Sequence, residues 1–152
     1  MKIGKKFSLL FVLVLSLSVP LVVMAEYIAE NEGHAIMEWT VNSPVYTLNG
    51  EFYIASAVPF VEYNSTSGLP MMPIRYVAEG LGATVAWNRA AGTVIVDTYD
   101  ATWLISIDSP LPNDMGTPFV HSGRVFVPLA YVSEVLGASV NWNSETGAIL
   151  IY

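Results

Sequence analysis

The sequence predicts an α+β fold made of two tandem repeats, each an antiparallel β-sheet with one short α-helix. Two nearly identical nonapeptides, GLGATVAWN at 80–88 and VLGASVNWN at 135–143, stand 55 residues apart. Each follows a segment with the apolar spacing of a helix and precedes a run with strand character. Turn residues such as Gly and Asn separate these segments, which favours antiparallel strands joined by tight connections.

The internal repeat extends well beyond the nonapeptide. At a shift of 55 residues, segment 67–96 aligns with 122–151 without a gap, and 13 of 30 positions are identical. Further matches at somewhat larger shifts join 59–61 to 118–120 and 37–44 to 103–110. The shift changes only across polar segments, where loops tolerate insertions. The repeat therefore predicts one unit at 35–99 and a second at 100–152, with 35–152 forming one compact domain.

Residues 1–25 have the features of a secretory signal peptide. Three lysines precede an apolar stretch that starts at Phe7, and cleavage is expected after Ala25. An uncleaved membrane anchor is the alternative, because the apolar stretch is nearly long enough to span a bilayer. Residues 26–34 then form an acidic segment before the first unit. We expect a secreted or extracellular protein, with wall association as a further option, that has no membrane contact after cleavage.

Charge and cysteine content exclude several classes of function. Removal of segment 1–25 takes away all the lysines and leaves a chain with three arginines and 13 acids, a formal charge of −10. Such a surface repels nucleic acid, because it offers no cationic patch to the phosphates. The chain has no cysteine, so disulfides and thiolate metal sites are excluded and the fold depends on its apolar core.

Local patterns predict the first elements of each unit. Apolar and polar residues alternate at 37–41 and again at 103–107, which is typical of a half-buried strand. In the first unit, Asn49 and Gly50 predict a hairpin, because both residues accept a positive φ. The second unit has a short loop with Pro, Asn and Gly in that place.

The next strand of each unit is expected to end at a proline and to lead into a helix of roughly nine residues. Pro73 and Pro128 suit the first helical turn, where a missing N–H costs nothing. Gly82 and Gly137 are placed to end the two helices in a left-handed conformation. The apolar stripes that identify the helices are Ile74, Val77, Ala78 and Leu81, and Leu129, Val132, Ser133 and Leu136.

The strand after each helix carries a tryptophan, Trp87 or Trp142. We expect this side chain to be the main core residue packed between helix and sheet. Burying one tryptophan removes about 150–250 Å² from water, worth roughly 4–6 kcal/mol as an upper bound. Because only a short turn joins 94–97 to 102–108, these segments are expected to pair directly. The two units would then share a sheet or a core.

In the pattern VPLxxVxEVLGAxVxWN…G…ILI, the chain resembles the copper amine oxidase N-terminal-like domain, a module of exported proteins of Gram-positive bacteria. The resemblance covers residues 35–152 and implies an antiparallel sheet around a short helix. It implies no copper or quinone chemistry, since these belong to a separate catalytic domain of the oxidases. The family's usual Arg is replaced by Ala130 in the second unit, and its usual acid by Asn88 and Asn143. The residues that carry the resemblance are Pro73, Arg75, Gly82, Ala83, Trp87, Pro128, Gly137, Ala138 and Trp142.

Metal binding and cofactors are not expected. A transition-metal site needs several imidazoles or a mixed His and carboxylate cluster, and His34 and His121 lack partners at ligand spacing. We expect both histidines to be exposed. Calcium is the remaining option for an acidic chain, but no calcium-loop pattern occurs. The acids considered for it, which we expect to be solvated, are Asp97, Asp100, Asp108 and Asp114.

The chain is not expected to be an enzyme, because no set of nucleophile, base and stabilising group emerges. Glu79 is expected to pair with Arg75 one helical turn away, as a surface interaction. Ser122 follows His121 without a third group to orient it. The carboxylate pairs that were considered are Asp97 with Asp100 and Glu79 with Glu134.

Aromatic residues offer the remaining candidate for binding. Trp39, Trp87, Trp103 and Trp142 lie on alternating apolar faces and are assigned to the core. Tyr76 and Tyr131 occupy the same helix position and are expected to pack with a solvated hydroxyl. The other tyrosines with freedom to bind are Tyr53, Tyr63 and Tyr99. The loops of 53–69, rich in aromatic residues, proline and glycine, are a hypothetical binding surface.

The sequence therefore favours a non-catalytic secreted or cell-surface module with a binding or spacing role in the bacterial cell envelope. Its expected partners are a cell-wall polysaccharide or another exported protein. An accessory protein that modulates an exported enzyme is the alternative, and a small exported hydrolase is a more remote one. Oligomerisation stays open, because a strand exposed at a unit boundary can pair with another chain.

Overall fold

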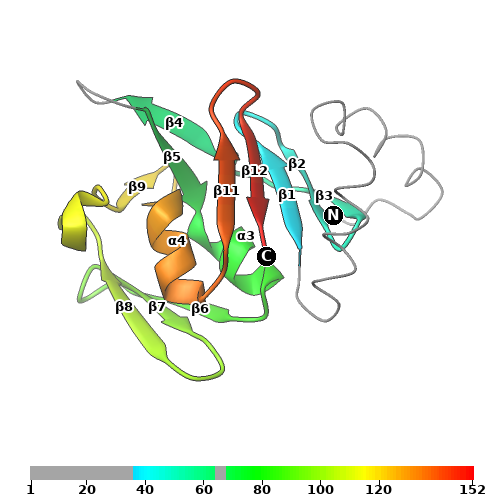
Figure 1. Ribbon diagram of the computed structural model, residues 1–152. Coiled ribbons are helices and arrows are strands. Elements are labelled where there is room, and N and C mark those ends of the chain that lie inside the picture. Colours follow the sequence, from blue (N-terminus) through cyan, green and yellow to red (C-terminus); the bar gives the residue numbers. More distant parts are fainter. Residues whose placement is uncertain (1–35, 64–67) are drawn as a thin grey trace.

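The computed structural model describes residues 36–63 and 68–152 of the chain. These residues form antiparallel β-sheets, two α-helices and one short 3₁₀ turn, so the α+β class is confirmed (Figure 1). Neither helix in these ranges has the length and apolar character that crossing a lipid bilayer requires.

The strands form three sheets, in which every neighbouring pair is antiparallel. The five-stranded sheet has the order β11 (Val140–Asn143), β12 (Ala148–Ile151), β1 (Met37–Thr40), β2 (Val45–Leu48) and β3 (Glu51–Ile54). The central sheet has the order β4 (Phe60–Tyr63), β5 (Gly68–Pro73), β10 (Arg124–Pro128) and β9 (Phe119–His121). The three-stranded sheet has the order β6 (Thr84–Asn88), β7 (Thr93–Asp97) and β8 (Thr102–Ser106).

Two helices, α3 (Ile74–Gly80) and α4 (Leu129–Leu136), follow β5 and β10 directly. Pro73 and Pro128 are the last residues of these strands and the N-caps of the helices, one position earlier than the expected first turn. Gly82 with φ 87° and Gly137 with φ 63° follow the helices, as predicted. Glycine is needed there because a left-handed backbone is strained for residues that carry a Cβ.

The tight hairpin predicted at Asn49 and Gly50 is confirmed. These residues have φ values of 51° and 75°, and β2 pairs with β3 from Leu48 opposite Glu51 onward. In the second unit the same place is taken by a loop that contains the 3₁₀ turn η2 (Pro112–Asp114). The backbone N–H of Leu111 donates to the carbonyl oxygen of Gly116 at 2.8 Å and closes this loop on itself.

The sheets do not divide between units 35–99 and 100–152, so the expectation of one sheet per unit is wrong. Strand β12 pairs with β1, β10 pairs with β5, and β8 pairs with β7. The last pairing confirms the predicted contact across the unit junction, which a short turn makes easy. A strand's edge bonds to whichever strand lies beside it, and the local pattern does not say which unit supplies it.

The strand registers follow the alignment of the two units. Met37 lies opposite Ile151, and Trp103 lies opposite Val96. In the sequence alignment Trp103 is the counterpart of Met37, and Ile151 is the counterpart of Val96. The two outer sheets therefore repeat one arrangement, in which the first strand of either unit joins the hairpin that follows the other unit's helix.

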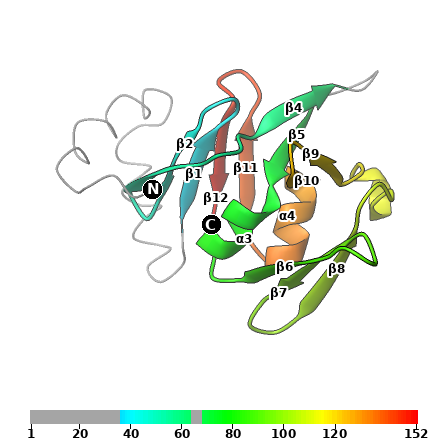
Figure 2. The ribbon, with the colours of Figure 1, turned by 180° about the vertical axis from the view of Figure 1, so that it is seen from behind.

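One hydrophobic cluster contains buried side chains from both units, so the predicted shared core is confirmed. The helices contact each other and both central strands, β5 and β10. The reverse view shows α3 and α4 next to each other between the outer sheets (Figure 2). Fully buried side chains at the centre of the cluster include Met37, Met72, Val77, Val96, Val127, Val132 and Ile151.

Candidate functional site

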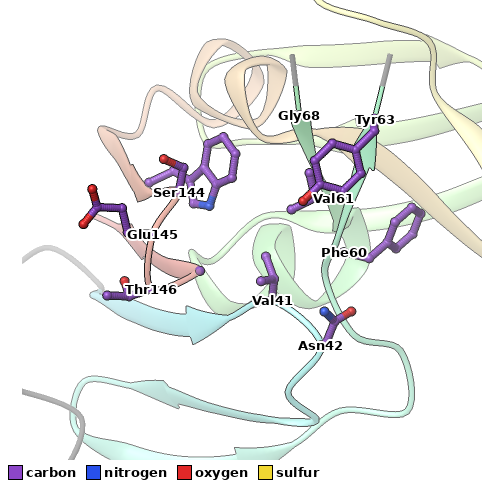
Figure 3. A pocket seen from close by; sticks show the side chains of 11 residues that line it. Val41, Asn42, Phe60, Val61, Tyr63, Gly68, Ser144, Glu145 and Thr146 are labelled. Carbon is purple, nitrogen blue, oxygen red and sulfur yellow. The ribbon is translucent and has the colours of Figure 1, made fainter. Parts of the chain in front are cut away.

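A hollow of about 490 Å³ opens between the β4–β5 hairpin and the turn that joins β11 to β12. Ser144, Glu145 and Thr146 of the turn lie along one side (Figure 3). Phe60, Val61 and Tyr63 of β4 lie along the other. The hollow thus places hydroxyl and carboxylate groups opposite an aromatic and aliphatic wall.

The polar side is held by Asn143. Its side-chain oxygen accepts hydrogen bonds from the backbone N–H groups of Glu145 at 2.9 Å and Thr146 at 3.1 Å. Its backbone oxygen accepts a third bond, from the N–H of Gly147 at 2.8 Å. Asparagine side chains stabilise turns in this way. Asn88 accepts the N–H of Ala91 at 3.1 Å in the corresponding turn, which explains why the repeated nonapeptide ends in Asn.

Backbone bonds tie the floor of the hollow to its walls. The N–H of Val41 donates to Gly147 at 3.0 Å, and the N–H of Asn42 donates to Pro59 at 2.7 Å. Asn42 has a φ of 62°, a left-handed conformation that asparagine tolerates better than most residues. The β4 strand and the β11–β12 turn are thereby held at a fixed separation.

Trp142 lines the hollow with its indole partly buried. Its Nε1–H is inaccessible to solvent and has no acceptor among the described residues. By contrast, the Nε1–H of Trp39 donates to the carbonyl oxygen of Ser43 at 2.8 Å. An unpaired buried donor costs about 1–3 kcal/mol. Beside a hollow, such a donor marks a place where an added acceptor would stabilise the protein.

The expectation that Trp87 is a main core residue is wrong. Its side chain is 42% exposed, on the outer strand β6 of the three-stranded sheet. Trp142 lines the same hollow as Tyr63 and Gly68, the last pair of the β4–β5 ladder. The corresponding β9–β10 ladder ends one pair earlier, at His121 opposite Arg124. Trp39 is the tryptophan that is buried, at 2% exposure.

Of the sequence motif residues, Trp142 alone lines the hollow. The expected pair of Arg75 and Glu79 is confirmed, with Nη1 and Oε1 3.0 Å apart on the exposed side of α3. The buried Pro73 and Pro128 and the turn-forming Gly82 and Gly137 stabilise the strand–helix–strand units.

Asp97 is the last residue of β7, whereas Asp100, Asp108 and Asp114 lie in connections between strands. The Thr102 hydroxyl donates to Asp97 at 2.6 Å, and the Thr98 hydroxyl donates to Asp100 at 3.0 Å. Asp108 and Asp114 have positive φ values of 60° and 55°. Within 36–63 and 68–152, no three His, Cys, Asp or Glu side chains gather as metal ligands would.

The histidines and the candidate catalytic groups are separate from the hollow. His34 lies outside the described residues. His121 is exposed, and its ring packs 6.2 Å from the rings of Phe60 and Phe126. Ser122 has a φ of 49° in the β9–β10 turn. Glu79 and Glu134 lie on exposed positions of different helices.

The hydroxyls of the two helix tyrosines differ from expectation. The backbone N–H of Ser56 donates to the Tyr76 hydroxyl at 2.8 Å, and Arg124 reaches the Ser56 hydroxyl at 3.2 Å. Burial raises the pKa of Tyr76, but the bonds from Ser56 and the charge of Arg124 outweigh burial, so that this pKa is lowered overall. Burial, together with nearby Glu134, raises the pKa of Tyr131. Tyr131 is only 7% exposed.

The hypothetical surface at 53–69 contributes part of the hollow, through Phe60, Val61, Tyr63 and Gly68. Its residues 64–67 lie outside the described ranges. The polar side, at 144–146, was missed. The sequence signal for it was the Asn of the repeated nonapeptide, because a turn-forming Asn after a strand tryptophan predicts where the following side chains project.

Comparison with known proteins gives one match. The model of the family described as copper amine oxidase N-terminal domain matches residues 23–96 and 112–152, most of the chain. Neither the curated proteins nor the solved structures contain a significant match.

Proposed function

The chain belongs to the copper amine oxidase N-terminal domain family, a non-catalytic module, and on that premise we propose that it binds glycan in the bacterial cell envelope. The proposed protein is secreted or held at the cell surface, and the hollow beside Trp142 is its binding site. The observation that carries this proposal is a hollow with an aromatic wall and a polar wall, lined also by Trp142, whose buried indole N–H has no acceptor among the described residues.

Sugar rings suit this combination of groups. A pyranose offers C–H faces that pack on aromatic rings, and hydroxyl and acetamido groups that bond to amides, hydroxyls and carboxylates. Tyr63 is 80% exposed and free to stack. Asn42, Ser144 and Glu145 offer donors and acceptors across the hollow. The indole N–H of Trp142 would gain an acceptor after a small movement of the ring.

The charge of the chain favours a neutral glycan over an anionic one. The sequence carries 13 acids against six basic residues, and Glu145 itself lies at the hollow. A surface of this sign repels anionic polymers such as those with phosphate groups. The N-terminal segment 1–25, with its lysines and apolar stretch, supports export to the compartment where wall glycans occur.

Two tandem repeats, 35–99 and 100–152, are also proposed as the origin of the fold. The matching registers support this, since Trp39 opposite Ile149 and Ile105 opposite Val94 preserve the sequence alignment. Equivalent backbone bonds support it as well: Val41 to Gly147 and Ile107 to Gly92 both measure 3.0 Å. In this view each repeat donates its first strand to the sheet of the other.

The test is calorimetric titration of the protein with soluble oligosaccharides of N-acetylglucosamine, a neutral component of wall glycans. We expect saturable binding that weakens about five- to tenfold in Tyr63→Ala, as loss of one aromatic contact predicts. Tyr99→Ala is the matched control, because Tyr99 is exposed as well but lies in the β7–β8 turn, outside the hollow lining. Equal affinity in the two variants, or no binding of the oligosaccharides, would contradict the proposal.

A further inference from the structure

The two outer sheets differ in one place. The edge of β1 that faces away from β12 is covered by β2, whose residues Leu48, Thr47 and Tyr46 lie opposite Met37, Glu38 and Trp39. Strand β8 holds the position of β1 in the other sheet, next to β7. No described strand pairs with its second edge. The loop that replaces the β2–β3 hairpin closes on itself through Leu111 and Gly116.

The backbone of β8 presents unpaired groups at this edge. Antiparallel ladders alternate between bonded and non-bonded pairs. The N–H of Ile107 donates to the carbonyl oxygen of Gly92, and the N–H of Thr98 donates to the carbonyl oxygen of Ala101. Residues 107 and 101, which flank β8 at its two ends, thus belong to hydrogen-bonded pairs. Odd-numbered residues of β8 therefore bond to β7. The N–H and C=O groups of Thr102, Leu104 and Ser106 point outward, with no bond to described residues.

The side chains leave the edge open to another strand. Proteins usually protect an edge strand with charged residues, proline or a bulge. Strand β8 has the sequence TWLIS, without charge or proline, and pairs with β7 in unbroken register. Leu104 at its centre is 66% exposed. Its counterpart in the aligned unit, Glu38, is paired with Thr47 of β2.

We propose that the free edge of β8 binds an extended segment of a partner polypeptide, which adds to the sheet as an antiparallel strand. The segment is uncharged where it faces 102–106 and carries basic residues after its C-terminal end. Strand β2 supplies the template, since it occupies the equivalent edge of β1 in the same register. This inference is independent of any glycan in the hollow.

The basic residues follow from the charges at one end of β8. Asp97 lies opposite Thr102, and Asp100 lies in the turn just before it, both exposed. An antiparallel partner ends beside these two carboxylates. The arginine nearest in sequence to these carboxylates is Arg89, which directly follows β6. The last residue of β6, Asn88, pairs with Thr93 at the opposite end of the sheet. Opposite charges at this end would fix the direction of the bound strand and speed its association.

The test uses the synthetic peptide Ser-Pro-Val-Tyr-Thr-Leu-Lys-Lys, which copies β2 and adds the basic end. We expect the peptide to slow amide hydrogen exchange at Leu104 in the full chain by about tenfold or more, since a paired amide is protected. Replacing both lysines by glutamate should weaken this protection at low salt. The Leu104→Pro variant has no amide of its own at this position. In it, the protection of the neighbouring outward amides of Thr102 and Ser106 should be abolished, because the central N–H is lost and proline is tolerated on that side of an edge strand.

Leu104→Ala is the matched control, because it shortens the side chain and keeps the N–H. Equal loss of binding in the alanine and proline variants would overturn strand addition. A peptide N-methylated at its threonine, the residue expected opposite Leu104, tests the same bond without changing the protein; undiminished protection by it would also overturn the proposal. So would absence of protection at millimolar peptide, or a dimer formed by the protein alone and abolished by Leu104→Pro, which would identify a second copy as the occupant.

Discussion

Met72 and Val127, which are 55 residues apart and occupy the same position in the two aligned units, lie directly opposite each other at the centre of the middle sheet. Both side chains are fully buried. The flanking pairs are reciprocal: Phe126 faces Pro73, and Pro128 faces Met71. The pairing of β5 with β10 is therefore symmetric about Met72 and Val127.

Division of the chain in the β7–β8 turn should give two fragments that fold only together. Fragment 26–99 would lack β12, the partner of β1, and fragment 100–152 would lack β5, the partner of β10. Each fragment would expose a large part of the apolar core that the two units share. A domain of this small size cannot stay folded with so much apolar surface exposed. Circular dichroism should show each fragment unfolded and their mixture folded. A native-like spectrum for either fragment alone would contradict the reciprocal arrangement.

Trp39→Ala should destabilise the protein far more than Trp87→Ala. Trp39 is 2% exposed, its ring centroid lies 4.7 Å from that of Tyr46, and its indole N–H donates to the carbonyl oxygen of Ser43. Its loss should therefore lower the free energy of unfolding by about 3–5 kcal/mol. Trp87 is 42% exposed, and roughly 1–2 kcal/mol is expected. Urea denaturation of both variants measures the difference. Equal midpoints would show that exposure does not separate the two rings.

Gly147→Ala should cost more stability than Gly92→Ala, although the two glycines occupy equivalent turns. Both have positive φ, 72° and 59°, so a left-handed alanine costs about 1–2 kcal/mol in either place. A Cβ at Gly147 would also lie 2.5 Å from Cγ2 of Val41, whereas at Gly92 it would meet no atom within 4 Å. Thermal unfolding of the two variants should show the larger drop for Gly147→Ala. The reverse order would indicate that Val41 moves away without cost.

Tyr76 should ionise at lower pH than Tyr131. Burial opposes ionisation of Tyr76, but hydrogen bonds from Ser56 and the charge of Arg124 lower its pKa overall, whereas burial raises the pKa of Tyr131. The ionisation of each tyrosine can be identified by ultraviolet difference titration, as the transition that the parent protein shows and the Tyr76→Phe or Tyr131→Phe variant lacks. The Tyr76 transition should lie below the ordinary tyrosine pKa, and the Tyr131 transition above it. Arg124→Gln should move the Tyr76 transition upward. An unmoved transition would exclude Arg124 as a cause.

The same shifts predict opposite effects on stability at alkaline pH. The lowered pKa of Tyr76 gives a contribution that is present above the unfolded pKa and is lost as pH falls through the folded pKa. The raised pKa of Tyr131 gives a contribution that is present below the unfolded pKa and is lost as pH rises through the folded one. Tyr131→Phe should therefore reduce the loss of stability above the unfolded tyrosine pKa, measured by denaturant unfolding.

Local features of the fold could be predicted because short segments determine them. Asn49 and Gly50 form a hairpin wherever they stand between two strands, and Gly82 ends a helix through its own backbone. The partner of each strand could not be predicted in this way. The pairing of β1 with β12 joins residues more than a hundred positions apart, and the repeat makes the wrong partner, β7, equally compatible with the local pattern.

The candidate site, like the fold, could be predicted from the sequence only in part. The stretch 53–69 could be identified from composition, since aromatic and turn residues gather there. The partial burial of Trp142 and the exposure of Trp87 could not be predicted, because the two tryptophans lie in matching nonapeptides. The surroundings of Trp142 include Phe60 and Val61, which are distant in sequence and come near the indole only in the folded molecule.

The pairing of β1 with β12 also has a bearing on the order in which the sheets form. Because Met37 lies opposite Ile151, the five-stranded sheet cannot close until both of these distant segments have been synthesised. Contacts between such distant segments form slowly. The five-stranded sheet is therefore expected to close late in folding, after the β2–β3 hairpin, which joins neighbouring segments.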